Sequence, residues 1–115
     1  MNKVVLVGRL TAKPELKTSD STSYTRFSVA IPRNYKTEDG QRETDFISVI
    51  AFGKNAENIA KYLDKGNLVA IDGRIQTGSY DDKEGNKKYT FDVALDNFEF
   101  MESKKETKED KPQTM

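Results

Sequence analysis

The sequence predicts an all-β domain with one helix, built as a small, partly open barrel of five strands. Three observations lead to this class. Short segments rich in β-branched and aromatic residues recur along the 115-residue chain between turn signals. Only one segment carries apolar residues at helical spacing, and it falls between the third and fourth predicted strands. Glycines interrupt the first and fourth strands, where they would bend the sheet.

A loop separates the first two predicted strands. Residues 3–11, KVVLVGRLT, form a β-branched run that Gly8 interrupts. Residues 12–21 contain a proline and an SDS cluster, which are typical of a loop. From Ser23 the letters YTRFSVAI place apolar residues on one face, so a second strand is expected to run to about Pro32.

The third predicted strand lies in residues 44–54, TDFISVIAFGK, after an Asp39-Gly40 turn that makes a long hairpin arm. Successive side chains in a strand point to opposite sides, so this strand has apolar residues on both faces. We expect one face to pack on the core and the other to carry exposed aromatics. The first face has Ile47, Val49 and Ala51, and the second has Phe46, Ser48, Ile50 and Phe52.

The predicted helix covers residues 54–66, KNAENIAKYLDKG. Asn55 is the expected N-cap, and Gly66 stands where a left-handed C-cap is expected. The apolar residues at helical spacing are Ala56, Ile59, Ala60 and Leu63.

Two further strands complete the pattern, at residues 68–80 with Gly73 inside and at residues 89–100 after a polar turn. In the last strand, alternate residues from Tyr89 to Leu95 share one face, whereas Phe98 and Phe100 take the other parity. A bulge near Asp96-Asn97 would explain the switch, because one extra residue reverses the face.

This order is the layout of an oligonucleotide/oligosaccharide-binding (OB) barrel, a partly open Greek-key barrel with the helix between strands three and four. A five-stranded meander with a packed helix is the alternative. Residues 1–101 are expected to form this single domain. Residues 102–115, ESKKETKEDKPQTM, are too polar to bury a core and are expected to form a disordered charged tail.

The composition weighs against catalysis and against a metal or cofactor. The chain has no cysteine and no histidine, so thiolate sites and the commonest general base are missing. The DDKEGN stretch lacks the ligand spacing of a calcium loop and is expected to be a charged turn. An enzyme that uses carboxylates is therefore the least favoured function. No segment near the amino terminus predicts a signal peptide or membrane span, which makes a cytoplasmic protein the expectation.

Aromatic and basic residues alternate in a way that favours a single-stranded nucleic acid as partner. The net charge is zero, but the first 36 residues carry seven basic and two acidic residues. Aromatic faces stack on unpaired bases, and cations contact phosphates. For Phe52 a core position is an equally good interpretation, and a Tyr80–Tyr89 pair could simply stabilise a hairpin. Four other phenylalanines are expected in the core: Phe27, Phe91, Phe98 and Phe100.

Three stretches of the sequence resemble the bacterial and phage single-stranded DNA-binding proteins (SSB). They are NKVVLVGRLTAKPELK, FISVIAFGKNAENIAKYLDKGNLVAIDGRIQTGSY and EGNKKYTFDVALDNFEFM, in uninterrupted order from Asn2 to Met101. The resemblance implies the OB barrel, a homotetramer, and binding of single-stranded DNA with little sequence preference during replication, recombination or repair. A related barrel that serves only as a protein-interaction subunit is the competing interpretation.

The resemblance also implies which residues bind the strand. The stacking residues would be Tyr35, Phe46, Phe52 and Tyr80. The resemblance and the positions of basic residues near these aromatics also predict the phosphate contacts. The favoured candidates are Lys54 and Arg74, and the others are Arg33, Lys3, Arg9, Lys65, Lys87 and Lys88. This chain has no tryptophan, whereas the family often has tryptophan at three of the stacking positions.

Two more features are interpreted through the family. The first strand has apolar residues on both sides, which fits a strand that packs on the core and meets another subunit, or one buried on both sides in a monomer. The carboxyl end, KEDKPQTM, lacks the acidic tip with apolar residues through which many members recruit partners. We therefore expect a short form of the family with little recruitment of other proteins through its tail.

Overall fold

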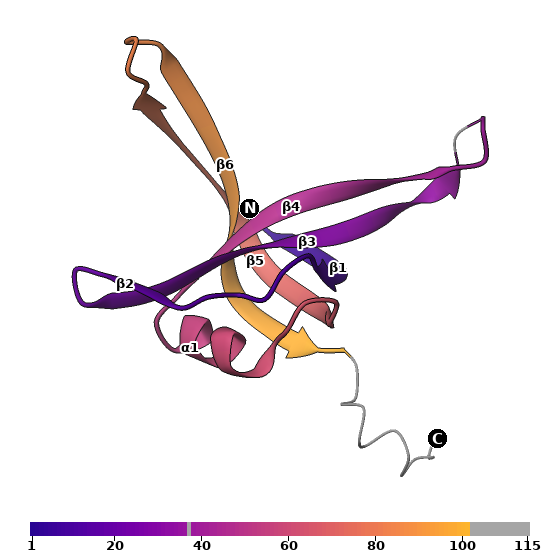
Figure 1. The fold of residues 1–115 in the computed structure, drawn as a ribbon, viewed down its shortest axis with the longest axis horizontal. Helices are drawn as coiled ribbons and strands as arrows, with labels where there is room; N and C mark the ends of the chain where they lie inside the picture. Colours follow the sequence, from indigo (N-terminus) through magenta and orange to yellow (C-terminus); the bar gives the residue numbers. More distant parts are fainter. Residues whose placement is uncertain (37, 102–115) are drawn as a thin grey trace.

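The structure is a computed structural model that describes residues 1–36 and 38–101, without the side chain of Tyr35. The predicted tail lies outside the described residues. Figure 1 shows the elements in chain order. They are β1 Val4–Leu10, β2 Lys17–Ser19, β3 Thr22–Lys36, β4 Arg42–Phe52, α1 Gly53–Tyr62, β5 Leu68–Asp81 and β6 Lys87–Phe100.

Five of the strands close into a barrel, which confirms the predicted fold class. The sheet order is β1-β5-β6-β4-β3-β2, and an additional pairing of β1 with β3 joins the ends of the barrel. The β1–β3 seam rests on two residue pairs, Arg9 with Ala30 and Leu10 with Val29. The parallel seam between β4 and β6 also rests on two, Val49 with Val93 and Ile50 with Ala94. Antiparallel pairs make up the rest of the sheet.

The segment predicted as a loop before the second strand contains a strand of its own. Lys17–Ser19 form β2, which pairs with the start of β3 through a tight turn. Asp20 and Ser21 have φ angles of 49° and 67°, as a two-residue hairpin turn requires. The short polar segment carries no apolar alternation, so its strand character comes only from pairing. With β2 counted, α1 follows the fourth strand of the chain rather than the third.

The prediction that the second strand ends at Pro32 is wrong, because β3 continues to Lys36. Pro32 still pairs with Thr44 of β4, and the register shifts between Pro32 and Lys36. A proline lacks only the N–H donor, which an irregular hairpin tolerates.

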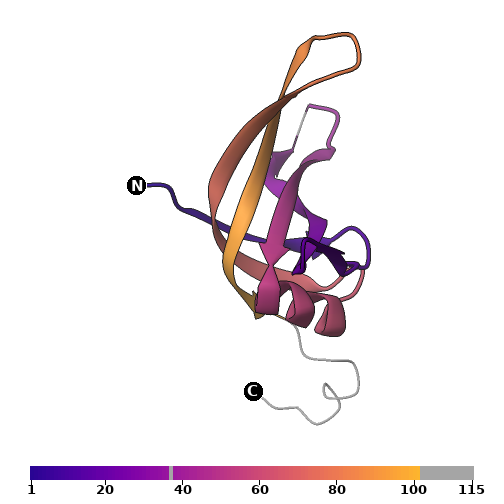
Figure 2. The same ribbon diagram turned by 90° about the vertical axis from the view of Figure 1, so that its left-hand side faces the viewer.

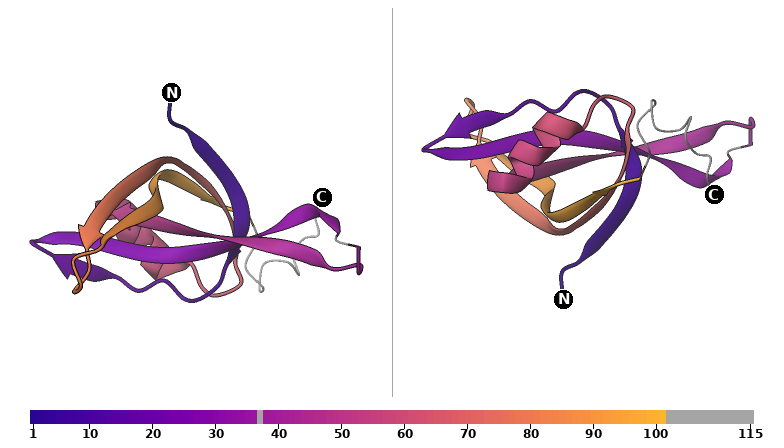
Figure 3. Two further views of the ribbon diagram at one scale, coloured as in Figure 1. Left: turned by 90° about the horizontal axis from the view of Figure 1, so that it is seen from above. Right: turned by 90° about the horizontal axis from the view of Figure 1, so that it is seen from below.

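The two turns of β3 lie at opposite ends of the molecule, one with β2 and one with β4 (Figure 3). The β3–β4 and β5–β6 hairpins extend as arms on the side away from α1 (Figure 2).

The predicted bulge in the last strand is confirmed. Asp72 of β5 pairs with Asn97 and the next residue, Gly73, pairs with Leu95, so Asp96 has no partner on β5. The extra residue reverses the alternation and turns Phe98 toward the core. A Cβ atom on Gly73 would collide with the Ala94 carbonyl oxygen, which explains the glycine opposite the bulge.

The barrel interior is apolar, and α1 covers its lower end in Figure 1. The helix contributes Ala56 and Ile59, and Leu63 directly after it adds a third side chain; none of the three is more than 1% exposed. Both predicted caps are wrong. The N-cap is Phe52, without a side-chain hydrogen bond, and the helix ends before Leu63. Gly66 has the expected positive φ of 87° but belongs to the turn that follows.

Among the four phenylalanines expected in the core, two are exposed. Phe27 is buried and Phe98 packs against the core. Phe91 is 53% exposed and Phe100 is 37% exposed, because they lie toward the two ends of β6, where no second layer covers them.

Among the helices that the structure describes, none is long and apolar enough to cross a membrane.

Candidate nucleic-acid interface

Side chains on the outside of β3, β4, β6 and β5 form one continuous surface, which we call the outer face. Residues paired across neighbouring strands point to the same side of a sheet. Arg26 of β3 pairs with Ile50, Ile50 with Ala94 of β6, and Ala94 with Arg74 of β5. This row therefore places an arginine on each side of an apolar centre.

Three predicted stacking residues are exposed on the outer face. Phe46 and Phe52 lie on β4 at the same parity as Ile50, and Tyr80 lies on β5 at the same parity as Arg74. Their exposed fractions are 66%, 49% and 57%. The exposure of Phe52 rules out the core interpretation of that residue. The fourth, Tyr35, lies on the β3 side of the β3–β4 arm, and its side chain is not described.

Tyr80 and Tyr89 do not form the cross-strand pair considered from the sequence. Tyr80 pairs with Lys88, whereas Tyr89 pairs with Ser79, so the two rings point to opposite sides of the β5–β6 arm. Tyr89 is 79% exposed. The outer face of this arm thus combines an aromatic ring with the Lys88 cation.

The two favoured cations lie near the β6 bulge. Arg74 donates to the Asp96 carboxylate at 2.5 Å. The Asn55 side chain donates to the Asp96 backbone oxygen at 3.2 Å, which ties the start of α1 to the same bulge. Lys54, next to Asn55, is exposed and has no ion pair among the described residues. Both favoured cations therefore belong to segments that contact Asp96, Arg74 directly and Lys54 through its neighbour Asn55.

Arg33 is held by carboxylates on the β3–β4 arm. Its guanidinium donates to both oxygens of Asp45, at 2.9 and 3.1 Å, and to Glu43 at 3.1 Å. The hydrogen bond from Arg33 keeps the pKa of Asp45 below the ordinary value of 3.8, although partial burial opposes the shift. Arg33 therefore needs to exchange a carboxylate for a phosphate before it contacts a nucleic acid.

Lys3 precedes β1, and Arg9 lies near the other end of that strand. Lys3 forms an ion pair with Asp72, and this hydrogen bond raises the pKa of Lys3. Arg9 donates to the Gly66 backbone oxygen at 2.9 Å. Arg9 also pairs with Ala30, which pairs with Phe46, so Arg9 lies on the same side of the sheet as that ring, with β3 between them. Lys3 is placed at the far edge of the barrel.

The other three lysines are dispersed. Lys65 is exposed in the turn after α1, next to the Gly66 oxygen that accepts from Arg9. Lys87 and Lys88 are on the β5–β6 arm. Only Lys88 shares the side of Tyr80, and its ammonium group lies 3.9 Å from Asp82.

Comparison with known proteins gives the family. The family model of the Single-strand binding protein family matches residues 1–101. This chain belongs to that family. The resemblance inferred from the sequence motifs is thereby confirmed. In this member of the single-strand binding protein family, the three motif stretches cover β1, α1 and β6 and most of β4 and β5.

Curated relatives are similar over nearly the whole chain. A protein of Staphylococcus aureus (strain MSSA476) named Single-stranded DNA-binding protein 1 is 46% identical over 105 residues, 90% of this chain and 67% of the relative. Single-stranded DNA-binding protein 1 of Clostridium acetobutylicum is 43% identical over 108 residues, which cover 92% and 98%. Single-stranded DNA-binding protein of Clostridium perfringens is 48% identical over 105 residues, which cover 90% and 67%.

Two outer-face residues of this single-strand binding protein were missed as candidates. Arg26 forms an ion pair with Asp92 at 3.3 Å, and Tyr24 contacts Phe52 with ring centroids 6.5 Å apart. A signal for both was present in the sequence, because they alternate with the buried Phe27. Their place in the interface could not be inferred from the sequence, because it depends on the pairing of β3 with β4, which puts Tyr24 beside Phe52.

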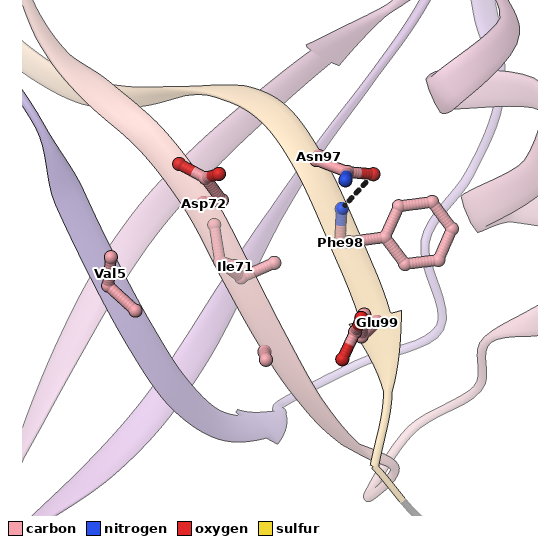
Figure 4. A pocket seen from close by; sticks show the side chains of 7 residues that line it. Val5, Ile71, Asp72, Asn97, Phe98 and Glu99 are labelled. Carbon is pink, nitrogen blue, oxygen red and sulfur yellow. Dashed lines mark hydrogen bonds between the residues drawn. The ribbon is translucent and has the colours of Figure 1, made fainter.

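A small pocket between β1, β5 and β6 offers no comparable site for an anion. Figure 4 shows Val5, Ile71 and Phe98 beside the carboxylates of Asp72 and Glu99. The volume is about 160 Å³, and no lysine or arginine lines it. Negative charge in the lining would repel a phosphate.

Proposed function

We propose that this protein binds single-stranded DNA with little sequence preference and coats it during replication, recombination or repair. The observation that carries the proposal is the exposure of Phe46, Phe52 and Tyr80 on one face, with Arg26 and Arg74 between them. Exposed apolar residues that gather on one face mark an interaction site. The curated relatives are named for the same activity.

The proposed mechanism is stacking combined with charge neutralisation. Unpaired bases stack on the three exposed rings and on Tyr35, a contribution of about 1–3 kcal/mol per base. The main phosphate contacts are assigned to Lys54 and Arg74, and the secondary ones to Arg33, Arg9, Lys65 and Lys88. Lys3 and Lys87 lie off the outer face and would contact only DNA that continues past it. Every base has a π-face and every nucleotide a phosphate, so this arrangement is tolerant of sequence.

The carboxylates on the outer face affect how tightly the strand is held. Arg74 and Arg26 are each paired with an aspartate of β6. A phosphate that displaces the aspartate gains one ion pair and loses another. The net gain per arginine is therefore smaller than for the unpaired Lys54.

We also propose that the protein assembles as a homotetramer through β1. Val5 and Val7 on the outside of β1 are 68% and 46% exposed, whereas Val4 and Leu6 pack against the core. The monomer therefore leaves one apolar side of β1 uncovered. Static light scattering after gel filtration should give four chains per particle, and Val5→Lys with Val7→Lys should reduce the mass. A monomeric parent protein would refute the assembly.

Titration with oligo-dT tests the function. The chain has five tyrosines and no tryptophan, so its fluorescence comes from tyrosine. This fluorescence should be quenched on binding, because bases stack on exposed tyrosine rings. The logarithm of affinity should fall with the logarithm of salt concentration by about 0.7 per phosphate contact. Absence of binding at low salt would favour the alternative, an OB barrel that only contacts proteins. A parallel titration with oligo-rU measures the preference for DNA over RNA.

A further inference from the structure

A basic groove adjoins the outer face at Tyr24, whose ring contacts Phe52, and most of its lining has not been assigned so far to the interface. It has a volume of about 460 Å³, within the range of roughly 300–1,000 Å³ typical of small-ligand sites. Residues between β1 and β2, and the facing parts of β2 and β3, form its walls. The lining residues are Ala12, Lys13, Glu15, Lys17, Tyr24 and Arg26.

The charge of the groove is positive. Three cations face one carboxylate, that of Glu15. Lys13 and Lys17 form no ion pair among the residues that the structure describes, in contrast to Arg26, which is held by Asp92. Two lysines that need not give up a partner are well suited to contact phosphate.

The groove continues the outer face. Lys17 of β2 pairs with Tyr24 of β3, and Tyr24 pairs with Phe52 of β4, so the three side chains form one row across three strands. The rings of Tyr24 and Phe52 are tilted by 40° with centroids 6.5 Å apart. A chain of bases stacked on Phe52 could therefore step onto Tyr24 without leaving the surface.

We propose that this groove is an additional single-strand site, in which Tyr24 stacks on a base and Lys13 and Lys17 contact the flanking phosphates. It extends the DNA path from Phe52 toward the β2–β3 turn, at the end of β3 away from the β3–β4 arm (Figure 3). The inference rests on the proposed function, since it lengthens the site for the same ligand. A strand long enough to pass Phe52 engages the groove, and a shorter one does not.

Replacement of the two lysines tests the proposal with little risk to folding, because both are exposed. In Lys13→Gln with Lys17→Gln, the salt dependence of binding to a long oligo-dT should decrease by about 0.7 per lost contact, 1.4 in total. Lys61→Gln, on the surface of α1, is the control for loss of one charge. A double variant that keeps the parental affinity and salt slope would overturn the groove.

A second variant tests stacking. Tyr24→Ala should weaken binding of long oligo-dT by roughly 5- to 150-fold, while Tyr24→Phe keeps the ring and should bind as the parent does. A 5-iododeoxyuridine oligonucleotide should photocrosslink to Tyr24, as mapped by mass spectrometry. Crosslinks confined to Phe46, Phe52 and Tyr80 would overturn the groove and leave the proposed function intact. Failure of the parent protein to bind oligo-dT at all would refute both.

Discussion

Arg74 and Asp96 are joined by a 2.5 Å hydrogen bond across the β6 bulge. Asp96 is the bulged residue, which the β5–β6 ladder leaves without an opposite residue, and its carboxylate accepts from Arg74 of β5. The neighbouring pair of Arg26 and Asp92 repeats the arrangement between β3 and β6. In both cases a carboxylate of β6 is paired with a cation that we propose as a phosphate contact.

Removal of the competing carboxylate should therefore strengthen binding. Asp96→Asn should increase the affinity for oligo-dT by about 1.5- to 5-fold, the range expected from an exposed ion pair of 0.2–1 kcal/mol. Glu57→Gln on α1 changes the net charge equally but leaves Arg74 paired, and it is the control. Fluorescence titration at fixed salt measures both. Equal effects of the two variants would mean that only net charge matters.

The two tyrosines of the β5–β6 arm should differ in their effect on binding. Tyr80→Ala removes a ring from the outer face and should weaken binding by about 1–3 kcal/mol. Tyr89→Ala removes an even more exposed ring from the other side and should have little effect. Thermal unfolding of both variants shows whether the fold is retained. A similar loss of affinity in both would contradict the assignment of the outer face.

Phe52 and Ile59 separate binding from stability, although they are only seven positions apart. Ile59 is fully buried, so Ile59→Ala should destabilise the protein by about 2–5 kcal/mol. Phe52 is 49% exposed, so Phe52→Ala should cost less stability and should weaken binding by about 1–3 kcal/mol. Urea unfolding and oligo-dT titration give the two quantities. A stable Phe52→Ala variant with parental affinity would remove Phe52 from the site.

The Arg33–Asp45 pair should make a pH-dependent contribution on the β3–β4 arm. Because the pKa of Asp45 is lowered in the folded state, its contribution to stability is present above the ordinary value of 3.8 and is lost as the pH falls through the lowered pKa. NMR titration should find the midpoint of Asp45 below 3.8. In Arg33→Gln the midpoint should rise toward that value. An unchanged midpoint would mean that Arg33 is not the cause.

Residues with clear alternation could be placed from the sequence. Val49 and Ala51 are in the core as expected, and the reversal at Asp96 was visible because Leu95 and Phe98 have opposite parities. β2 had no such signal, because its three polar residues are a strand only through their partners on β3. The predicted helix caps were wrong, because residue preferences do not show where packing against the barrel begins and ends a helix.

The sequence by itself determined the alternating faces of the strands, the helix and the family motifs, because these depend on spacing along the chain. The tertiary structure decided which residues of one face meet solvent. Ile50 shares the parity of Phe46 and Phe52 but is only 7% exposed, since neighbouring strands flank it on both sides. It also decided which charges are paired and joined Lys17 to Phe52, because both relationships cross strands that are distant in sequence.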